Sequence, residues 1–148
     1  MTQEAEIREI ASRHAGMDGA LLPILHAVQE RFGYLPPPTT AAVADVLNLS
    51  KADVHGVITF YDDFRTEPAG NRKIRVCRSE ACQAVGGEQL ASHILQRLGI
   101  GFHETTADGR YSLDPVFCLG NCACSPAVMI DDDVHGRVTP ERFDALLD

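Results

Sequence analysis

Four of the five cysteines fall into two closely spaced pairs. Cys77 and Cys82 have the spacing C-x4-C, and Cys118 and Cys122 have the spacing C-x3-C. Each pair lies in a polar, glycine-containing loop after a predicted strand, so we expect the two loops to face each other at one end of a sheet. Thiolate sulfur is the soft ligand that iron and bridging sulfide prefer. The pattern therefore predicts one 2Fe–2S cluster with these four cysteines as its ligands.

The spacing makes other uses of the cysteines less favourable. Structural zinc sites usually contain tight C-x2-C knuckles, and thioredoxin-type redox pairs are C-x-x-C; neither spacing occurs here. Plant-type ferredoxins need a third cysteine three residues after the second, where this chain has Val85. Buried structural cysteines would not explain why four of them gather in two loops. Zinc and a purely structural role remain as alternatives to the cluster.

Cys124 belongs to neither pair. It follows Cys122 by two residues, so we expect its thiol to donate a hydrogen bond beside the cluster and not to be a fifth ligand. Rieske-type ligation by His26, His55 or His135 is not required, because four cysteines already complete a 2Fe–2S site. We assign no catalytic residue to this chain.

The composition is that of an ordinary globular protein. The chain has 148 residues, of which 45% are hydrophobic and 23% charged, enough for one or two small domains. A net charge of −8 disfavours nucleic acid as a partner, because phosphate binding needs a basic face. The apolar runs are too short to cross a membrane, and the acidic start does not resemble a secretory signal. We therefore expect a cytoplasmic location, where thiols stay reduced and an odd cysteine count favours metal ligation over disulfides.

The chain has two halves, in which the apolar residues recur with different spacing; the second half contains all the cysteines. The first half has apolar residues at helical spacing over residues 3–14 and 20–32, and two more helices are predicted after Pro38 and Ser50. Gly33 is a stop signal, and Ser50 with Asp53 resembles an N-terminal capping pair. Short connections favour a helical bundle over residues 1–68, followed by a polar linker around residues 66–73.

The second half, residues 69–148, changes to the period of strands. Strands are predicted at residues 73–77, 110–117, 127–130 and 134–138, with one helix after Gly87 and a last helix from Pro140 that Thr139 can cap. A βα unit followed by a ββα unit is typical of a thioredoxin-like domain. Such folds often place a cis proline where Pro126 stands. The predicted fold class is α+β, a helical bundle followed by a thioredoxin-like α/β domain that binds the 2Fe–2S cluster.

The motifs around the cysteines resemble a known family. C-R-S-E-A-C-Q-A-V-G-G from Cys77 and C-L-G-N-C-A-C-S-P from Cys118 are similar to the thioredoxin-like 2Fe–2S subunits of the NADH-oxidising module. Complex I, bidirectional NAD-linked hydrogenases and soluble NAD-dependent formate dehydrogenases share that module. H-A-V-Q-E-R-F-G-Y-L-P from His26 and V-H-G-V-I-T-F-Y-D-D-F-R from Val54 resemble its helical region. The resemblance covers roughly residues 15–147 and implies that Cys77, Cys82, Cys118 and Cys122 are the cluster ligands.

The resemblance also implies partners and a function. A larger subunit that binds FMN and NAD would contact this chain directly, with the 2Fe–2S cluster close to the flavin. The first cysteine loop and the order Cys122-Ala123-Cys124 look most like the gamma subunit of formate dehydrogenases. We therefore expect an electron-transfer subunit, inactive by itself, of a complex that converts formate and NAD to carbon dioxide and NADH. Its catalytic subunit would hold further iron–sulfur clusters and a molybdenum or tungsten cofactor.

Two alternatives to the formate complex remain. One is the equivalent subunit of respiratory complex I or of a bidirectional NAD-linked hydrogenase. The other is a free-standing thioredoxin-like ferredoxin, although a shuttle protein needs no additional helical bundle.

Overall fold

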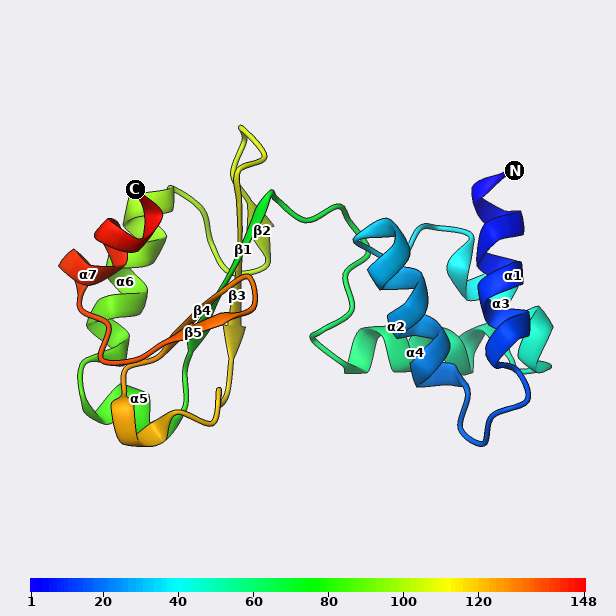
Figure 1. Cartoon of the computed structure of the whole chain (residues 1–148), viewed down its shortest axis with the longest axis horizontal. Coiled ribbons are helices and arrows are strands. Elements are labelled where there is room, and N and C mark those ends of the chain that lie inside the picture. The colour runs from blue at the N-terminus through cyan, green and yellow to red at the C-terminus, as the bar shows by residue number, and fades with distance from the viewer. The chain divides into compact units, whose positions relative to one another are not determined.

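Four helices form the first of two units into which the chain divides, Met1–Pro68 and Ala69–Asp148 (Figure 1). The computed structural model describes all residues, Met1–Asp148. The helices of the first unit are α1 (Gln3–His14), α2 (Leu21–Phe32), α3 (Thr39–Leu47) and α4 (Lys51–Phe60). All four helices that the sequence predicts are therefore present: α1 and α2 lie within one residue of the expected bounds, and α3 and α4 begin after Pro38 and Ser50 as expected.

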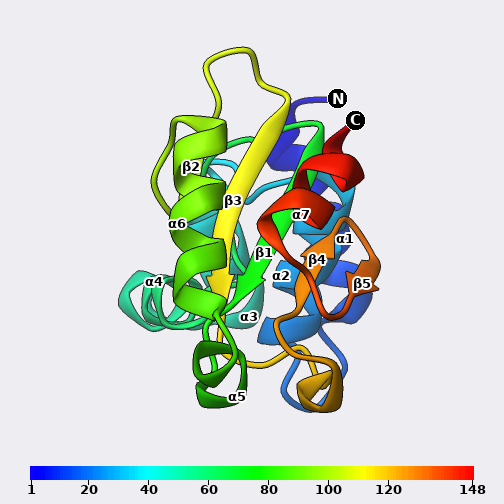
Figure 2. The same cartoon turned by 90° about the vertical axis from the view of Figure 1, so that its left-hand side faces the viewer.

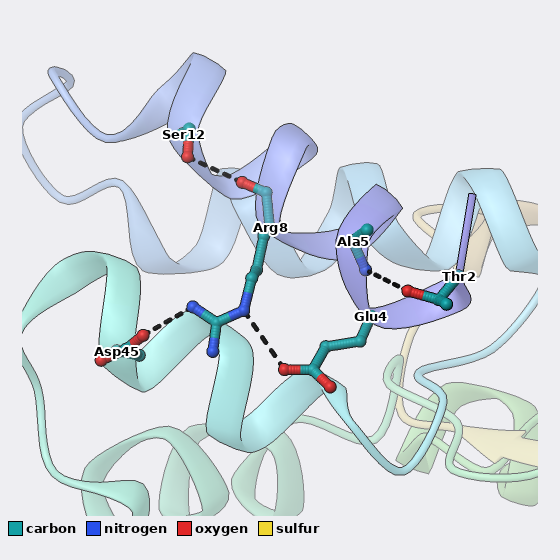
Figure 3. A network of polar contacts seen from close by, with 6 residues as sticks. All are labelled: Thr2, Glu4, Ala5, Arg8, Ser12 and Asp45. Carbon is teal, nitrogen blue, oxygen red and sulfur yellow. Dashed lines mark hydrogen bonds and ion pairs between the residues drawn. The ribbon is translucent and has the colours of Figure 1, made fainter.

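Local side-chain chemistry sets the ends of these helices. The Ser50 hydroxyl accepts a hydrogen bond from the Asp53 N–H at 3.0 Å, which confirms the predicted capping pair at the start of α4. Thr2 caps α1 in the same way, through the Ala5 N–H at 3.3 Å (Figure 3). Gly33 ends α2 with a φ of 79°, a left-handed conformation that glycine adopts without steric cost.

The apolar faces of the four helices meet in one core. Its largest fully buried side chains are Ile7, Ile24, Leu25, Val28, Val43 and Val54. At the rim, the Arg8 guanidinium joins α1 to α3 by an ion pair with Asp45 at 2.5 Å (Figure 3). Because both side chains are largely exposed, we expect the buried apolar surface to supply most of the stability of this unit.

The second unit contains a five-stranded sheet and three α-helices. Its strands are β1 (Arg72–Cys77), β2 (Glu104–Thr105), β3 (Tyr111–Val116), β4 (Val128–Ile130) and β5 (Asp133–His135). Its helices are α5 (Glu80–Ala84), α6 (Gly87–Leu98) and α7 (Pro140–Leu147), with a single 3-10 turn, η1 (Cys122–Cys124). The mixture of helices and sheet confirms the predicted fold class.

The sheet has the strand order β2-β3-β1-β4-β5, with β1 in the centre. β1 and β3 are parallel, and the other neighbouring strands are antiparallel. Both α6 and α7 lie on one face of the sheet (Figures 1 and 2). Phe143 of α7 and Leu90 and Ile94 of α6 are fully buried against Ile74 and Leu113 of the strands. This core fixes the central strand, at whose end the first cysteine lies.

Some local elements differ from the sequence prediction. The short elements α5, β2 and η1 were not predicted, and β5 ends at His135, before the expected bound. It ends there because Arg137 turns back with a φ of 48° and donates its N–H to the Cys124 carbonyl. The Ser125–Pro126 peptide bond is cis, which confirms the prediction made from the fold. None of the helices is both long and apolar enough to cross a membrane.

Candidate metal centre

The parallel pairing of β1 and β3 brings the two cysteine loops to one end of the sheet. Cys77 is the last residue of β1 and lies opposite Val116, the last residue of β3. Cys118 follows Val116 by two residues, so both loops leave the sheet at the same edge. Figures 1 and 2 show α5 and the single turn η1, which carry the later cysteine of each pair, at this end. The structure thus places together the loops that the sequence predicted would meet.

The first pair is buried. Cys77 and Cys82 expose only 2% and 1% of their surface. Cys82 lies on α5, which is packed tightly under the start of α6. A Cβ atom at Gly87 would lie only 2.6 Å from the Cys82 carbonyl oxygen, so this close approach requires glycine.

Hydrogen bonds around Cys82 favour its thiolate form. Burial by itself disfavours the charge and would raise the pKa of Cys82. Hydrogen bonds with the Ser125 hydroxyl, the Ala127 N–H, Cys77 and Ser79 outweigh burial, and the pKa of Cys82 lies below its ordinary value. Since only the thiolate binds metal, this shift favours Cys82 as a metal ligand.

The second pair is exposed to solvent. The Sγ atoms of Cys118 and Cys122 are 3.6 Å apart, and the Gly120 N–H donates a hydrogen bond to Cys118 Sγ at 3.2 Å. A tetrahedral metal ion with ~2.3 Å bonds to sulfur holds two sulfur atoms roughly 3.8 Å apart. This pair therefore already has the spacing that one metal ion requires of two ligands.

The two pairs affect each other electrostatically. The pKa of Cys122 is raised, first by its hydrogen bond and charge repulsion with Cys118, then by partial burial, and then by repulsion from Cys77 and Cys82. Loss of the Cys122 proton beside these sulfur atoms is therefore disfavoured unless a cation offsets the negative charge. Binding of positive iron would relieve this repulsion, and thiol protons would be released as it binds.

Taken together, the donor set fits a two-iron cluster. The four thiols are arranged as two pairs at the shared end of β1 and β3. In a 2Fe–2S cluster with four cysteines, each iron takes two thiolates and the bridging sulfides fill its other positions. One pair for each iron satisfies this requirement.

The remaining candidates from the sequence lie elsewhere. The Cys124 backbone is held by Arg137, but the structure records no hydrogen bond between the Cys124 thiol and the paired cysteines, so its role as a donor stays a prediction. His26 and His55 lie on α2 and α4 of the first unit, and His135 ends β5. The His26 ring contacts the Phe64 ring at a tilt of 49°, with 4.9 Å between the ring centroids, which agrees with a packing role.

Three residues of the site were missed by sequence reasoning. Ser79 Oγ lies 3.2 Å from Cys77 Sγ, and Ser125 Oγ lies 3.5 Å from Cys82 Sγ. A Cβ atom at Gly136 would lie 2.8 Å from Cys124 Cβ and 2.9 Å from the Cys124 carbonyl oxygen, so glycine is needed under the η1 turn. The closeness of both serines to cysteines along the chain was the one signal that the sequence contained.

Comparisons with known proteins show which family the chain belongs to. The sequence matches the family described as thioredoxin-like [2Fe-2S] ferredoxin over residues 7–148. It is 41% identical to a subunit of the NADH-quinone oxidoreductase of Pseudomonas aeruginosa over 147 residues, which cover 99% of this chain and 89% of that protein. It is 38% identical to a subunit of the NADP-reducing hydrogenase of Solidesulfovibrio fructosivorans, HndA, over 130 residues, 88% of this chain and 76% of the relative.

A solved structure has a similar fold. The crystal structure of an NAD+-reducing [NiFe]-hydrogenase in the air-oxidized state superposes with a TM-score of 0.69 at 24% sequence identity. The match covers 83% of this chain and 22% of the hydrogenase chain. At this level of identity, the superposition supports the fold.

Proposed function

The chain belongs to the thioredoxin-like [2Fe-2S] ferredoxin family, and we propose that it is the electron-transfer subunit of a complex that oxidises NADH or reduces NAD(P). Its cofactor is a 2Fe–2S cluster, which supplies one-electron transfer when bound. The relatives described above are named as subunits of an NADH-quinone oxidoreductase and of a hydrogenase. They favour these two types of complex for this chain.

The observation that carries the proposal is the convergence of the two cysteine loops at the shared end of β1 and β3. In the proposed site, Cys77 and Cys82 hold one iron, and Cys118 and Cys122 hold the other. The buried pair anchors the cluster within the fold, whereas the exposed pair keeps one side of it near the surface. Such a site keeps the distance for electron transfer between the cluster and a docked partner short.

A direct partner is part of the proposal. We propose that this chain docks on a subunit that binds FMN and NAD, and exchanges single electrons with its flavin. Large apolar side chains next to the cluster loops support docking: Phe117, just before Cys118, is 66% exposed, and Val85, after Cys82, is 56% exposed. A cytoplasmic location belongs to the same proposal, because an odd number of cysteines favours metal ligation in a reducing compartment over disulfides.

A formate dehydrogenase complex is the second candidate. It is favoured by the C-R-S-E-A-C-Q loop from Cys77 and by the order Cys122-Ala123-Cys124, which resemble the gamma subunits of those enzymes. In that case, a molybdenum- or tungsten-containing catalytic subunit would complete the assembly. The named relatives come from the other two complexes, so we rank formate dehydrogenase behind them.

Affinity purification of the tagged chain from its native host tests these assignments. We expect a flavin-containing subunit to co-purify, together with NADH-dependent reduction of an artificial acceptor. Separate assays with quinone, hydrogen and formate then identify the complex. Purification of the chain without flavin, as a homodimer that carries a cluster, would contradict the subunit proposal and favour a free-standing ferredoxin.

A further inference from the structure

Two serine hydroxyls lie beside the sulfur atoms of the buried cysteine pair. Ser79 Oγ is 3.2 Å from Cys77 Sγ, and Ser125 Oγ is 3.5 Å from Cys82 Sγ. A thiolate bound to iron carries no proton, so a hydroxyl at this position can only donate a hydrogen bond to the sulfur. The exposed pair has a different kind of donor, the Gly120 N–H, which donates to Cys118 Sγ.

Ser79 is unusual among the helix caps of this chain. It occupies the N-cap position of α5, with an extended φ of −70° and ψ of 162°. Thr2, Ser50 and Thr139 occupy the same position before α1, α4 and α7, and each accepts a backbone N–H through its side chain. The Ser79 side chain makes no such cap. Its hydroxyl faces Cys77 instead, which indicates that this serine serves the sulfur and not the helix.

Ser125 connects the two cysteine loops. Its hydroxyl donates to the Cys122 carbonyl at 2.8 Å and also lies within hydrogen-bonding distance of Cys82 Sγ. In the protein without metal, the Cys82 S–H can donate to Ser125 Oγ. Once Cys82 binds iron, its sulfur becomes a negatively charged acceptor and competes for the Ser125 proton.

We propose that the hydroxyls of Ser79 and Ser125 donate hydrogen bonds to the Cys77 and Cys82 sulfur ligands and raise the reduction potential of the cluster. The proposal rests on the ligand set of the proposed function. Reduction adds negative charge to the cluster, and a hydrogen bond to sulfur strengthens as that charge grows. Both sulfur atoms are buried, so water does not replace or screen these bonds. The reduced form is therefore stabilised more than the oxidised form.

Redox titration of the whole chain, followed by EPR, tests the proposal. The variants are Ser79→Ala, Ser125→Ala and the double variant. The conservative changes Ser79→Thr and Ser125→Thr retain the hydroxyl. Ser12→Ala is the matched control, because it removes a hydroxyl that donates only to the Arg8 carbonyl within α1 (Figure 3).

Each alanine variant is expected to shift the midpoint potential to more negative values. A tenfold loss in the one-electron equilibrium corresponds to about 59 mV. The double variant should show a larger shift than either single variant, because it removes the hydroxyl donors of both buried sulfur ligands. The threonine variants and Ser12→Ala should stay near the unmutated value. Unchanged potentials in alanine variants that retain their full iron content would overturn the proposal, as would an equal shift in Ser12→Ala.

A second measurement tests the hydrogen bonds to sulfur in the unmutated chain. Resonance Raman spectra of the oxidised, unmutated chain should show Fe–S(Cys) stretching bands that shift after exchange into D2O. Bands insensitive to deuterium would overturn the proposal. A cluster with an unmoved potential in the alanine variants would refute only the role of the serines, whereas an unmutated chain that binds no cluster would refute the ligand set as well.

Discussion

At the scale of single residues, the assigned roles of Cys118 and Cys124 differ although both lie in the second cysteine loop. Cys118 is half of a pair with metal-ligand spacing, whereas Cys124 has no such partner. We predict that Cys118→Ser strongly lowers the iron content of the purified chain, because serine oxygen is a harder and weaker ligand for the cluster. Cys124→Ser, the matched control, should retain about two irons per chain. Loss of iron in Cys124→Ser and its retention in Cys118→Ser would reverse the assignment.

The iron-free chain should show a pH dependence at Cys122. Its pKa is raised, mainly through Cys118, so the reactive thiolate forms only at higher pH than for an ordinary cysteine. Alkylation of Cys122 should therefore keep accelerating above the pH at which a free thiol levels off. In Cys118→Ser, the main cause is removed and the profile should move to lower pH. Peptide mass spectrometry measures both rates, and identical profiles would be inconsistent with the coupling.

Residue types and spacing made the cysteines predictable, but not the serines or Gly136. Metal ligation restricts a site to a few residue types, so four cysteines in two pairs indicate it directly. Whether a serine caps a helix or faces a sulfur depends on the position of another loop. Ser50 and Ser79 both precede a helix, yet Ser50 makes the cap and Ser79 does not.

At the scale of elements, the path between β5 and α7 supports the second cysteine loop. Gly136 packs against the η1 turn with no room for a side chain: a Cβ atom there would meet backbone and side-chain atoms of Cys124 within 3 Å. We predict that Gly136→Ala displaces this turn, lowers the free energy of unfolding by roughly 1–3 kcal/mol and reduces iron content. Urea unfolding and iron analysis measure the two effects.

Gly101→Ala is the control for this change. A Cβ atom at Gly101 would meet only the flexible Glu104 side chain, at 3.4 Å, so we expect little effect on stability or iron content. Equal behaviour of the two variants would show that the η1 turn does not depend on close packing at Gly136.

The long helices were predictable from the sequence, whereas the shortest helix and strand were not. Helices α1, α2 and α6 have several apolar residues on one face, and this periodicity identified them. The two-residue strand β2 and the five-residue helix α5 are too short for any period to be recognised. They exist because of tertiary contacts: β2 pairs with β3, and α5 packs against Gly87. The end of β5 likewise depends on a backbone hydrogen bond with the Cys124 carbonyl.

At the scale of the whole molecule, the two units have separate cores. All five cysteines and the complete sheet belong to Ala69–Asp148. We predict that residues 69–148, expressed alone, fold and bind the cluster, because their core of strands, α6 and α7 is formed without the helices of the first unit. Circular dichroism and iron analysis test this, and an unfolded or iron-free fragment would show that the first unit is required.

The sequence of this chain says less about the type of complex it belongs to than about its family and cofactor. The family and cofactor follow from residues of this chain, but the substrate oxidised by the assembly is chosen in other subunits. The loop from Cys77 to Gln83 favoured formate dehydrogenase, whereas the named relatives favour NADH-quinone oxidoreductase and hydrogenase. Side chains that do not touch the substrate carry little information about it.

Low-temperature EPR of the purified, dithionite-reduced chain, with iron, sulfide and zinc analysis of the same sample, tests the central claim most directly. We predict one unpaired electron per chain from a reduced 2Fe–2S cluster, with about two irons and two sulfides. A colourless, EPR-silent protein that contains zinc and no iron would contradict it.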